Sequence, residues 1–131
     1  MNRTTHPIQS GEDVVRVRQE VRARAIAAGF SLVEQTKFVT AASELARNTL
    51  HHGKGGEVHI EDMEMGASKG VRLVFEDNGP GIPDIERALT DGYTTGGGMG
   101  LGLSGARRLS SEFHIESAVG KGTRVSIARW K

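Results

Sequence analysis

The stretch from Asp77 to Gly105 reads DNGPGIPDIERALTDGYTTGGGMGLGLSG, and nine of the 18 glycines of the chain fall within it. The glycines form two clusters, separated by a short segment of helical character. Glycine loses the most conformational freedom on folding, so such a density makes a poor core and favours close approach of the backbone to a ligand. Backbone N–H groups that lead into a helix N-terminus bind phosphate well. This stretch therefore predicts a nucleotide site.

The composition is that of an ordinary soluble globular chain, and we expect a single domain over residues 1–131. Lys and Arg total 17 against 16 Asp and Glu, for a formal net charge of +1, which argues against a nucleic-acid partner. Cysteine is absent, so disulfides and thiolate metal sites are excluded. No apolar run approaches the ~18 residues of a membrane span, and the start of the chain has no signal-peptide pattern. We expect a cytoplasmic protein with no membrane contact.

Two helices are predicted before the glycine-rich stretch. The first begins at Ser10, with acidic residues in its first turn, and has a C-terminal stop signal at Gly29. The second begins at the capping box Ser31-Leu32-Val33-Glu34. Its apolar periodicity runs to about His52 and stops at Gly53.

Strands are predicted on both sides of the second helix. The segment Glu57–Met65 alternates between apolar and polar residues, and Thr4–Gln9 could form an edge strand. In the next strand the apolar residues alternate on one face: Val71, Leu73 and Phe75. The same period places Asp77 on that inward face, where a carboxylate is costly unless it has a partner.

The remainder of the chain completes an α+β pattern. We expect one or two helical turns over Pro83–Leu89 and a third main helix over Leu101–Phe113. Strands follow at His114–Ala118 and Thr123–Trp130, with Trp130 in the core. The predicted fold is a sandwich of mostly antiparallel strands covered on one face by helices.

Several familiar nucleotide motifs are excluded. No GxxxxGK[ST] occurs, so the chain is not a P-loop protein. The segment Gly100–Gly105 fits GxGxxG, but no strand precedes it and no acid follows about 20 residues on. The HRD and DFG signatures of eukaryotic-type protein kinases are also missing.

A more specific pattern is spread over four places: Glu44-Leu45-Ala46-Arg47-Asn48, Asp77-Asn78-Gly79-Pro80-Gly81, Gly96–Gly102 and Gly120-Lys121-Gly122-Thr123. Glu44 and Asn48 are four residues apart and so share a helix face. In order and spacing the four segments resemble the GHKL ATPases, which include gyrase B subunits and bacterial histidine kinases. The likeness runs from about Ser10 to Trp130. Within that superfamily the chain is most similar to anti-sigma-factor-type serine/threonine protein kinases, above all the switch kinases of bacterial stress signalling.

The resemblance implies a Bergerat ATP-binding fold, a two-layer α/β sandwich with a mixed, mostly antiparallel sheet. It implies that Asn48 binds Mg²⁺ together with the phosphates of ATP and that Glu44 acts as general base. It implies that Asp77 accepts a hydrogen bond from the adenine amino group. The resemblance also implies that Gly79 and Gly81 lie beside the base and that Thr123 supports the adenine site. The residues that it implies around the phosphates are Gly98, Gly100, Leu101 and Gly102.

The activity implied is ATP-dependent phosphorylation of a STAS-domain protein on serine or threonine, in a partner-switching system. The second partner would be a serine phosphatase in one branch and a sequestered sigma factor in the other. The alternative is an anti-sigma factor or ATP-dependent binding module with little kinase turnover. Glycines at both ends of Ile82–Gly98 lead us to expect a lid over bound nucleotide.

Two local alternatives concern the second helix. Glu44 could pair with Arg47 one turn away, an interaction that contributes only tenths of a kcal/mol. His51 lies near the Glu44 face and suggests a metal triad, but the adjacent His51 and His52 cannot easily face one ion. Capping or packing roles are favoured for both histidines.

Overall fold

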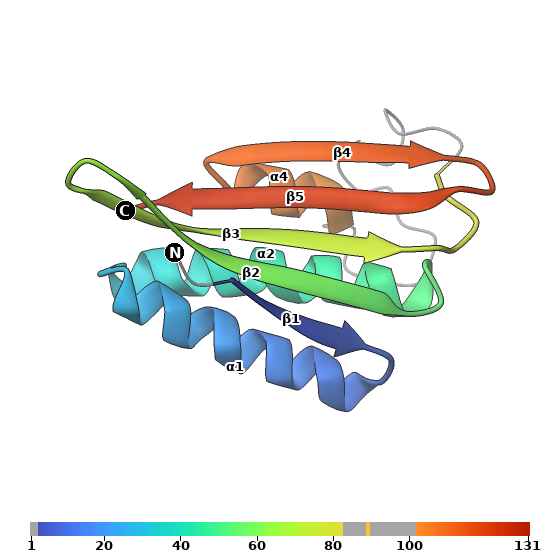
Figure 1. Ribbon diagram of the computed structural model, residues 1–131, viewed down its shortest axis with the longest axis horizontal. Coiled ribbons are helices and arrows are strands. Elements are labelled where there is room, and N and C mark those ends of the chain that lie inside the picture. The colour runs from blue at the N-terminus through green and yellow to red at the C-terminus, as the bar shows by residue number, and fades with distance from the viewer. Residues whose placement is uncertain (1–2, 83–88, 90–101) are drawn as a thin grey trace.

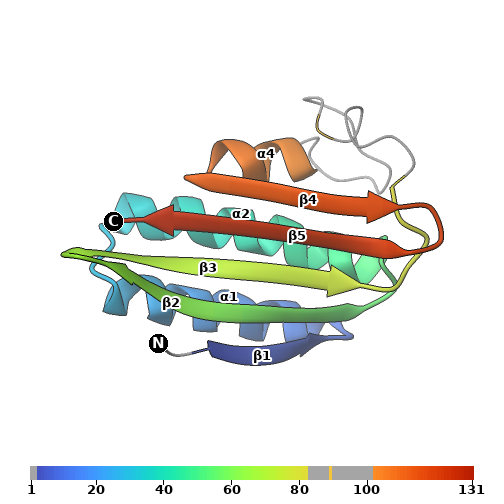
Figure 2. The same ribbon diagram turned by 45° about the horizontal axis from the view of Figure 1, so that its top comes forward.

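The computed structural model describes residues 3–82, 89 and 102–131. Its elements, in chain order, are β1 (Arg3–Ile8), α1 (Gly11–Ala27), α2 (Leu32–His51), β2 (Gly56–Met65), β3 (Ser68–Asp77), α4 (Gly102–Arg108), β4 (Glu112–Ala118) and β5 (Gly122–Trp130). The strands form one sheet in the order β1-β2-β3-β5-β4, in which every neighbouring pair is antiparallel. The described helices α1, α2 and α4 lie behind this sheet in Figure 2, and Figure 1 shows α1 along its β1 edge. The predicted α+β sandwich with helices on one face is confirmed.

The ends of the two long helices follow from their capping residues. Ser10 Oγ accepts a hydrogen bond from Asp13 N at 3.3 Å. The helix α1 ends at Ala27, with Ala28 as its C-cap and Gly29, with a φ of 88°, directly after it. At the start of α2, Ser31 Oγ accepts from Glu34 N at 3.2 Å while Ser31 N donates to Glu34 Oε1 at 2.9 Å. This is the predicted capping box, and the Ser31 backbone N–H lowers the pKa of the Glu34 carboxyl.

The core lies between the helices and the inward face of the sheet. The buried helix residues include Val17, Val21, Phe38, Ala41, Ala42 and Leu45, and they face buried strand residues Val58, Ile60, Val71, Leu73, Phe75, Val125 and Ile127. These positions alternate along the strands, as the predicted period of two requires. The opposite face of the sheet carries no described helix (Figure 2).

Arg24 ties α1 to the first two strands. Its side chain is 9% exposed and pairs with Asp62 Oδ1 at 2.9 Å and with Glu20 Oε1 at 3.0 Å. It also donates to Thr4 Oγ1 at 2.9 Å. A guanidinium with acceptors from α1, β1 and β2 therefore closes the end of the core near the N-terminus.

The third helix is shorter than predicted. It ends at Arg108, and Ser111 N already donates to Ala128 O at 2.8 Å, so the chain joins the sheet before Phe113. Phe113 lies in β4 opposite Ile127. Strand pairing with β5 thus overrides the helical periodicity of this segment.

The predicted core position of Trp130 is wrong. Its ring is half-buried, and its Nε1 donates to Glu112 Oε2 at 2.9 Å at the surface. The helical turns expected over Pro83–Leu89 fall outside the described residues except for Leu89, which packs against the core. None of the described helices is both long and apolar enough to cross a membrane.

Candidate functional site

Asp77 stands at the end of β3, between Gly56 of β2 and Thr123 of β5. Its Oδ1 accepts a hydrogen bond from Gly79 N at 2.9 Å. Burial raises the pKa of the Asp77 carboxyl, and backbone hydrogen bonds from Gly79 and Thr123 partly offset that rise. The site therefore presents an oriented, half-buried carboxylate, which suits a ligand with an N–H donor.

Gly53 brings the end of α2 directly against this carboxylate. A Cβ added to Gly53 would overlap the Asp77 side chain, and a Cβ on Gly79 would lie 2.7 Å from the Gly53 Cα. The turn is held by Gly53 N and His52 N, which donate to Asn48 O at 3.1 and 2.9 Å. From the sequence, Gly53 was predicted only as the end of the second helix, because no local pattern relates it to Asp77.

The turn between β4 and β5 supports the same region. Gly81 has a φ of 80°, and a Cβ there would overlap the backbone oxygen of Ala118. Ser117 Oγ accepts from Ile82 N at 2.8 Å and donates to Gly122 O at 3.0 Å. This places the backbone after Gly81 on the end of β4.

Ser117 also holds Thr123. The two hydroxyl oxygens lie 2.9 Å apart, and since the Ser117 proton goes to Gly122 O, Thr123 donates in this pair. Thr123 thus contacts Asp77 through its backbone and Ser117 through its side chain. No local sequence pattern marks Ser117 as a residue of this site. Its position follows from the pairing of β4 with β5.

Glu44 and Asn48 lie one turn apart on α2, which packs against the core. The Glu44 side chain is 17% exposed, and its Oε1 lies 3.6 Å from Arg47 Nη1. Arg47 is half exposed and also donates to Ser43 Oγ at 3.1 Å. The surface pairing of Glu44 is therefore present, but its length and the exposure of Arg47 make it weak.

Asn48 is half-buried, and its side chain makes no hydrogen bond to another described residue. A half-buried amide in this condition has its carbonyl oxygen available for a ligand. The partial burial of Asn48 and its available amide oxygen suit a Mg²⁺ ion bound together with phosphate, because hard cations take neutral and charged oxygen ligands.

The second glycine cluster is only partly described. Gly102 begins α4, which packs against α2 through a surface that includes buried Leu103 and Ala106. Gly98, Gly100, Leu101 and the expected lid up to Gly98 lie outside the described residues, apart from Ile82 and Leu89.

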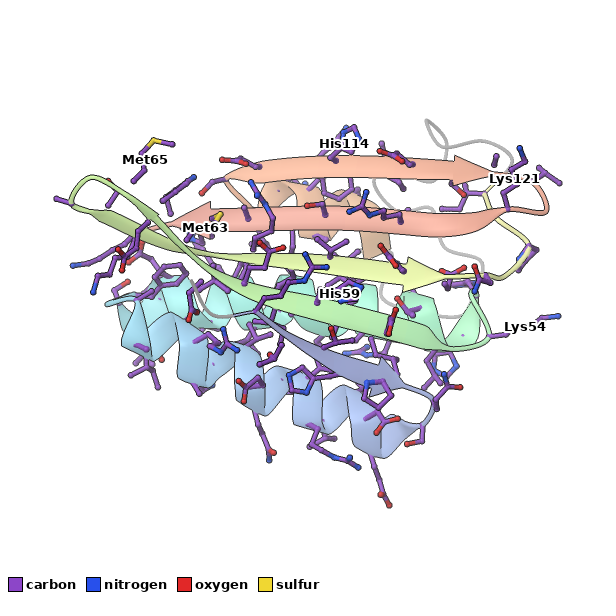
Figure 3. All side chains as sticks on the ribbon, in the orientation of Figure 1. Lys54, His59, Met63, Met65, His114 and Lys121 are labelled. Atoms are coloured by element: carbon purple, nitrogen blue, oxygen red, sulfur yellow. The ribbon has the colours of Figure 1, made fainter. Side chains whose placement is uncertain are left out.

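A hollow of about 390 Å³ opens beside Asp77 at the ends of β3, β4 and β5. Asn78, Lys121 and Thr123 line it with Asp77, and Glu76, Glu116 and Arg124 line its other side. Figure 3 shows Lys121 and Lys54 at this end of the sheet. None of the described lining residues belongs to α2, so this hollow reaches Asp77 from the helix-free face.

The comparison with known families decides what kind of site this is. The family model described as "Histidine kinase-, DNA gyrase B-, and HSP90-like ATPase" matches residues 33–131. The chain belongs to this family. Its nucleotide is therefore ATP, and the matched range includes α2 from Val33 onward, Asp77 and Thr123.

Similar proteins cover nearly the whole chain. The serine/threonine-protein kinase RsbT of Bacillus subtilis (strain 168) is 42% identical over 118 residues, covering 90% of this chain and 89% of RsbT. An anti-sigma F factor of Clostridium kluyveri is 32% identical over 130 residues, covering 90% of each chain. The anti-sigma F factor of Clostridium novyi (strain NT) is 29% identical over 133 residues, again covering 90% of each.

A solved structure supports the fold. The histidine kinase domain from the Erythrobacter litoralis EL346 blue-light activated histidine kinase matches 94% of this chain with a TM-score of 0.53 and 20% identity. This chain spans 60% of the length of that one. This chain therefore shares its fold with that histidine kinase domain.

Proposed function

We propose that this protein regulates by partner switching, with a STAS-domain protein as its substrate. It is an ATP-dependent protein-serine/threonine kinase, and it transfers the γ-phosphate of ATP to a hydroxyl of a regulatory protein. One kinase domain extends over residues 1–131. The second partner is a serine phosphatase, as in the switch-kinase branch that the sequence resembles.

The observation that carries the kinase activity is the joint presence of Glu44 and Asn48 on one face of α2, whose end abuts Asp77 through Gly53. A module that only bound nucleotide would need the acceptor and the metal ligand but no base. Glu44 is largely buried, and among the described residues its carboxylate has only a long contact, to Arg47, so it is available to a substrate hydroxyl.

Asp77, Asn48 and Glu44 each have a separate role in this proposal. Asp77 accepts from the adenine amino group, with its orientation kept by Gly79 and Thr123. Asn48 offers its amide oxygen to Mg²⁺, which would neutralise charge on the phosphates. Glu44 takes the proton of the attacking serine or threonine hydroxyl. Positioning and electrostatic stabilisation account for most of the rate in phosphoryl transfer, so the base completes a site that mainly holds its substrates.

The alternative is a binding module of the anti-sigma type, which sequesters a partner in an ATP-dependent manner with little turnover. The similarity to anti-sigma F factors favours this as the second candidate. The two differ in what happens to the partner, because only the kinase leaves phosphate on it.

The test is phosphate transfer from γ-labelled ATP to purified STAS-domain proteins of the same organism, with Mg²⁺ present. We expect label on one serine or threonine of one such protein, and strongly reduced label with Glu44→Gln. A protein that binds ATP and a sigma factor tightly but labels no STAS protein is the anti-sigma module instead.

A further inference from the structure

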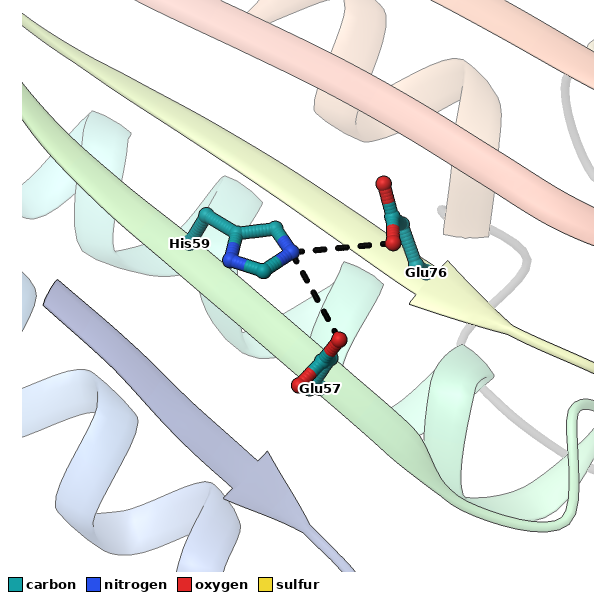
Figure 4. Close-up of side chains that lie close together, drawn as sticks. All are labelled: Glu57, His59 and Glu76. Carbon is teal, nitrogen blue, oxygen red and sulfur yellow. Dashed lines mark ion pairs between the residues drawn. The ribbon is translucent and has the colours of Figure 1, made fainter. Parts of the chain in front are cut away.

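The helix-free face of the sheet carries a cluster of three potential metal ligands, Glu57 and His59 of β2 and Glu76 of β3 (Figure 4). One ligand atom of each lies within 4.8 Å of the others. Glu57 and His59 do not line the hollow beside Asp77, whereas Glu76 does. The three side chains lie on the face of the sheet opposite the helices (Figure 4). We propose that this cluster binds a divalent transition metal ion, with Zn²⁺ as the best match.

The separations between the ligand atoms carry the proposal. His59 Nε2 lies 3.6 Å from Glu57 Oε1 and 3.6 Å from Glu76 Oε2. Hydrogen bonds from N–H to O are about 2.7–3.2 Å long, so neither contact is one. Two ligands bound to one Zn²⁺ at about 2.1 Å in tetrahedral geometry lie roughly 3.4 Å apart. His59 Nε2 therefore stands from each carboxylate at about the spacing of two ligands around a shared ion, and the two carboxylates have ligand atoms within 4.8 Å of each other.

The other nitrogen of the ring is already engaged. Thr5 Oγ1 of β1 lies 2.8 Å from His59 Nδ1. When Nδ1 carries the proton and donates to Thr5, the lone pair of Nε2 points between two carboxylates. Metal-binding histidines are commonly oriented by such a hydrogen bond from the nitrogen that does not bind the ion.

The charges around the cluster favour a cation. Glu57 and Glu76 are directly opposite each other on β2 and β3, an arrangement in which like charges destabilise a sheet. Arg124 Nε lies 3.1 Å from Glu76 Oε1, so it compensates one carboxylate and leaves Glu76 Oε2 for His59. A divalent ion would relieve the remaining repulsion.

The ligand set indicates the class of ion. One imidazole nitrogen and two carboxylate oxygens suit Zn²⁺ and its neighbours in the first transition row better than Ca²⁺ or Mg²⁺, which prefer oxygen alone. The His59 side chain is 12% exposed, while Glu57 and Glu76 are 47% and 39% exposed. Water therefore completes the coordination from the solvent side, and the ion joins β2 to β3.

The test is calorimetric titration of the full, nucleotide-free protein with Zn²⁺, which keeps the ATP site out of the measurement. We expect one equivalent to bind, and His59→Gln to weaken binding at least about tenfold, as losses around metal sites do. His114→Gln is the matched control, because His114 lies on the same face, is 72% exposed and, within the described part of the chain, pairs with one carboxylate alone, that of Glu116 at 3.1 Å. Its Zn²⁺ affinity should equal that of the wild type.

A second readout covers a variant that fails to fold. Addition of Zn²⁺ to the wild type should shift the ¹⁵N signal of His59 Nε2, and Glu57→Gln, at an exposed ligand, should reduce that shift with the fold intact. Absence of Zn²⁺ uptake by the wild type overturns the proposal. Equal uptake by His59→Gln and the wild type, or a ¹⁵N shift confined to other histidines, overturns it as well.

Discussion

The carboxylate of Asp77 occupies the space that a Cβ on Gly53 would need. Asp77 ends β3 and Gly53 follows the end of α2, so this contact brings the proposed adenine acceptor next to the helix that carries Glu44 and Asn48. Gly79 also lies close to this turn, because a Cβ added to it would be 2.7 Å from the Gly53 Cα. Residue size at Gly53 therefore controls the position of Asp77.

Gly53→Ala tests this contact. The added methyl group would displace the Asp77 side chain from its hydrogen bond with Gly79, so ATP affinity should fall at least about tenfold. Gly11→Ala is the matched control, because a Cβ there meets nothing within 4 Å. Calorimetry with ATP and Mg²⁺ measures both, and normal affinity in Gly53→Ala would show that the site adjusts to the methyl group.

Asp77→Asn tests the adenine assignment. The amide can present a donor where the adenine amino group needs an acceptor, and the unsatisfied pair costs on the order of 1–3 kcal/mol. We expect ATP affinity to fall by about tenfold or more while the circular dichroism spectrum is unchanged. Unchanged nucleotide affinity would sink the assignment.

The same variant should be stabilised, relative to the wild type, as the pH rises. The folded-state pKa of Asp77 is raised above the ordinary value of an aspartate, mainly by burial. Its ionisation therefore costs folding free energy, and the stability that Asp77 contributes below that value is lost as the pH rises through the folded pKa. Asn at this position does not titrate.

Urea unfolding of the nucleotide-free proteins at several pH values between about 4 and 7 measures this effect. The stability of Asp77→Asn minus that of the wild type should increase with pH and then level off. A difference that decreases with rising pH would contradict the raised pKa.

Asn48→Ala and Glu44→Ala should fail in different ways. Removal of a Mg²⁺ ligand should weaken metal-dependent ATP binding as well as transfer. Glu44→Ala should bind ATP nearly normally, since a base acts mainly in the transition state, and should transfer phosphate roughly 10²–10⁴ times more slowly. Binding and single-turnover transfer, measured side by side, separate the two roles. Loss of ATP binding in Glu44→Ala would make Glu44 structural.

Arg24→Met should destabilise the fold without affecting the site. The substitution leaves Asp62 and Glu20 without their buried partner, at a cost of about 1–3 kcal/mol. Arg16→Met on the same helix is the control, because Arg16 is 63% exposed and should contribute under about 1 kcal/mol. Urea unfolding compares them, and equal losses would mean that the buried network contributes little.

Local chemistry in the sequence was enough to predict most of the described helices and strands, and it supplied Asp77, Glu44 and Asn48 as candidate site residues. The Ser10 and Ser31 caps, the stops at Gly29 and Gly53 and the alternation that leads to Asp77 act within a few residues, so they can be recognised along the chain. The same holds for Glu44 and Asn48, whose common face follows from helix geometry alone.

Tertiary structure decided the features that depend on strand register and on how the helix meets the sheet. Phe113 was predicted in a helix but lies in β4, and Trp130 was predicted in the core but lies at the surface. The pairing of β4 with β5 determines which side of the sheet each of them faces. Antiparallel pairing also places Ser117 of β4 beside Thr123 of β5, and Glu57 of β2 opposite Glu76 of β3. The backbone hydrogen bonds of a sheet join residues distant in sequence, and a shift of one residue reverses every side chain, so local patterns do not contain this information.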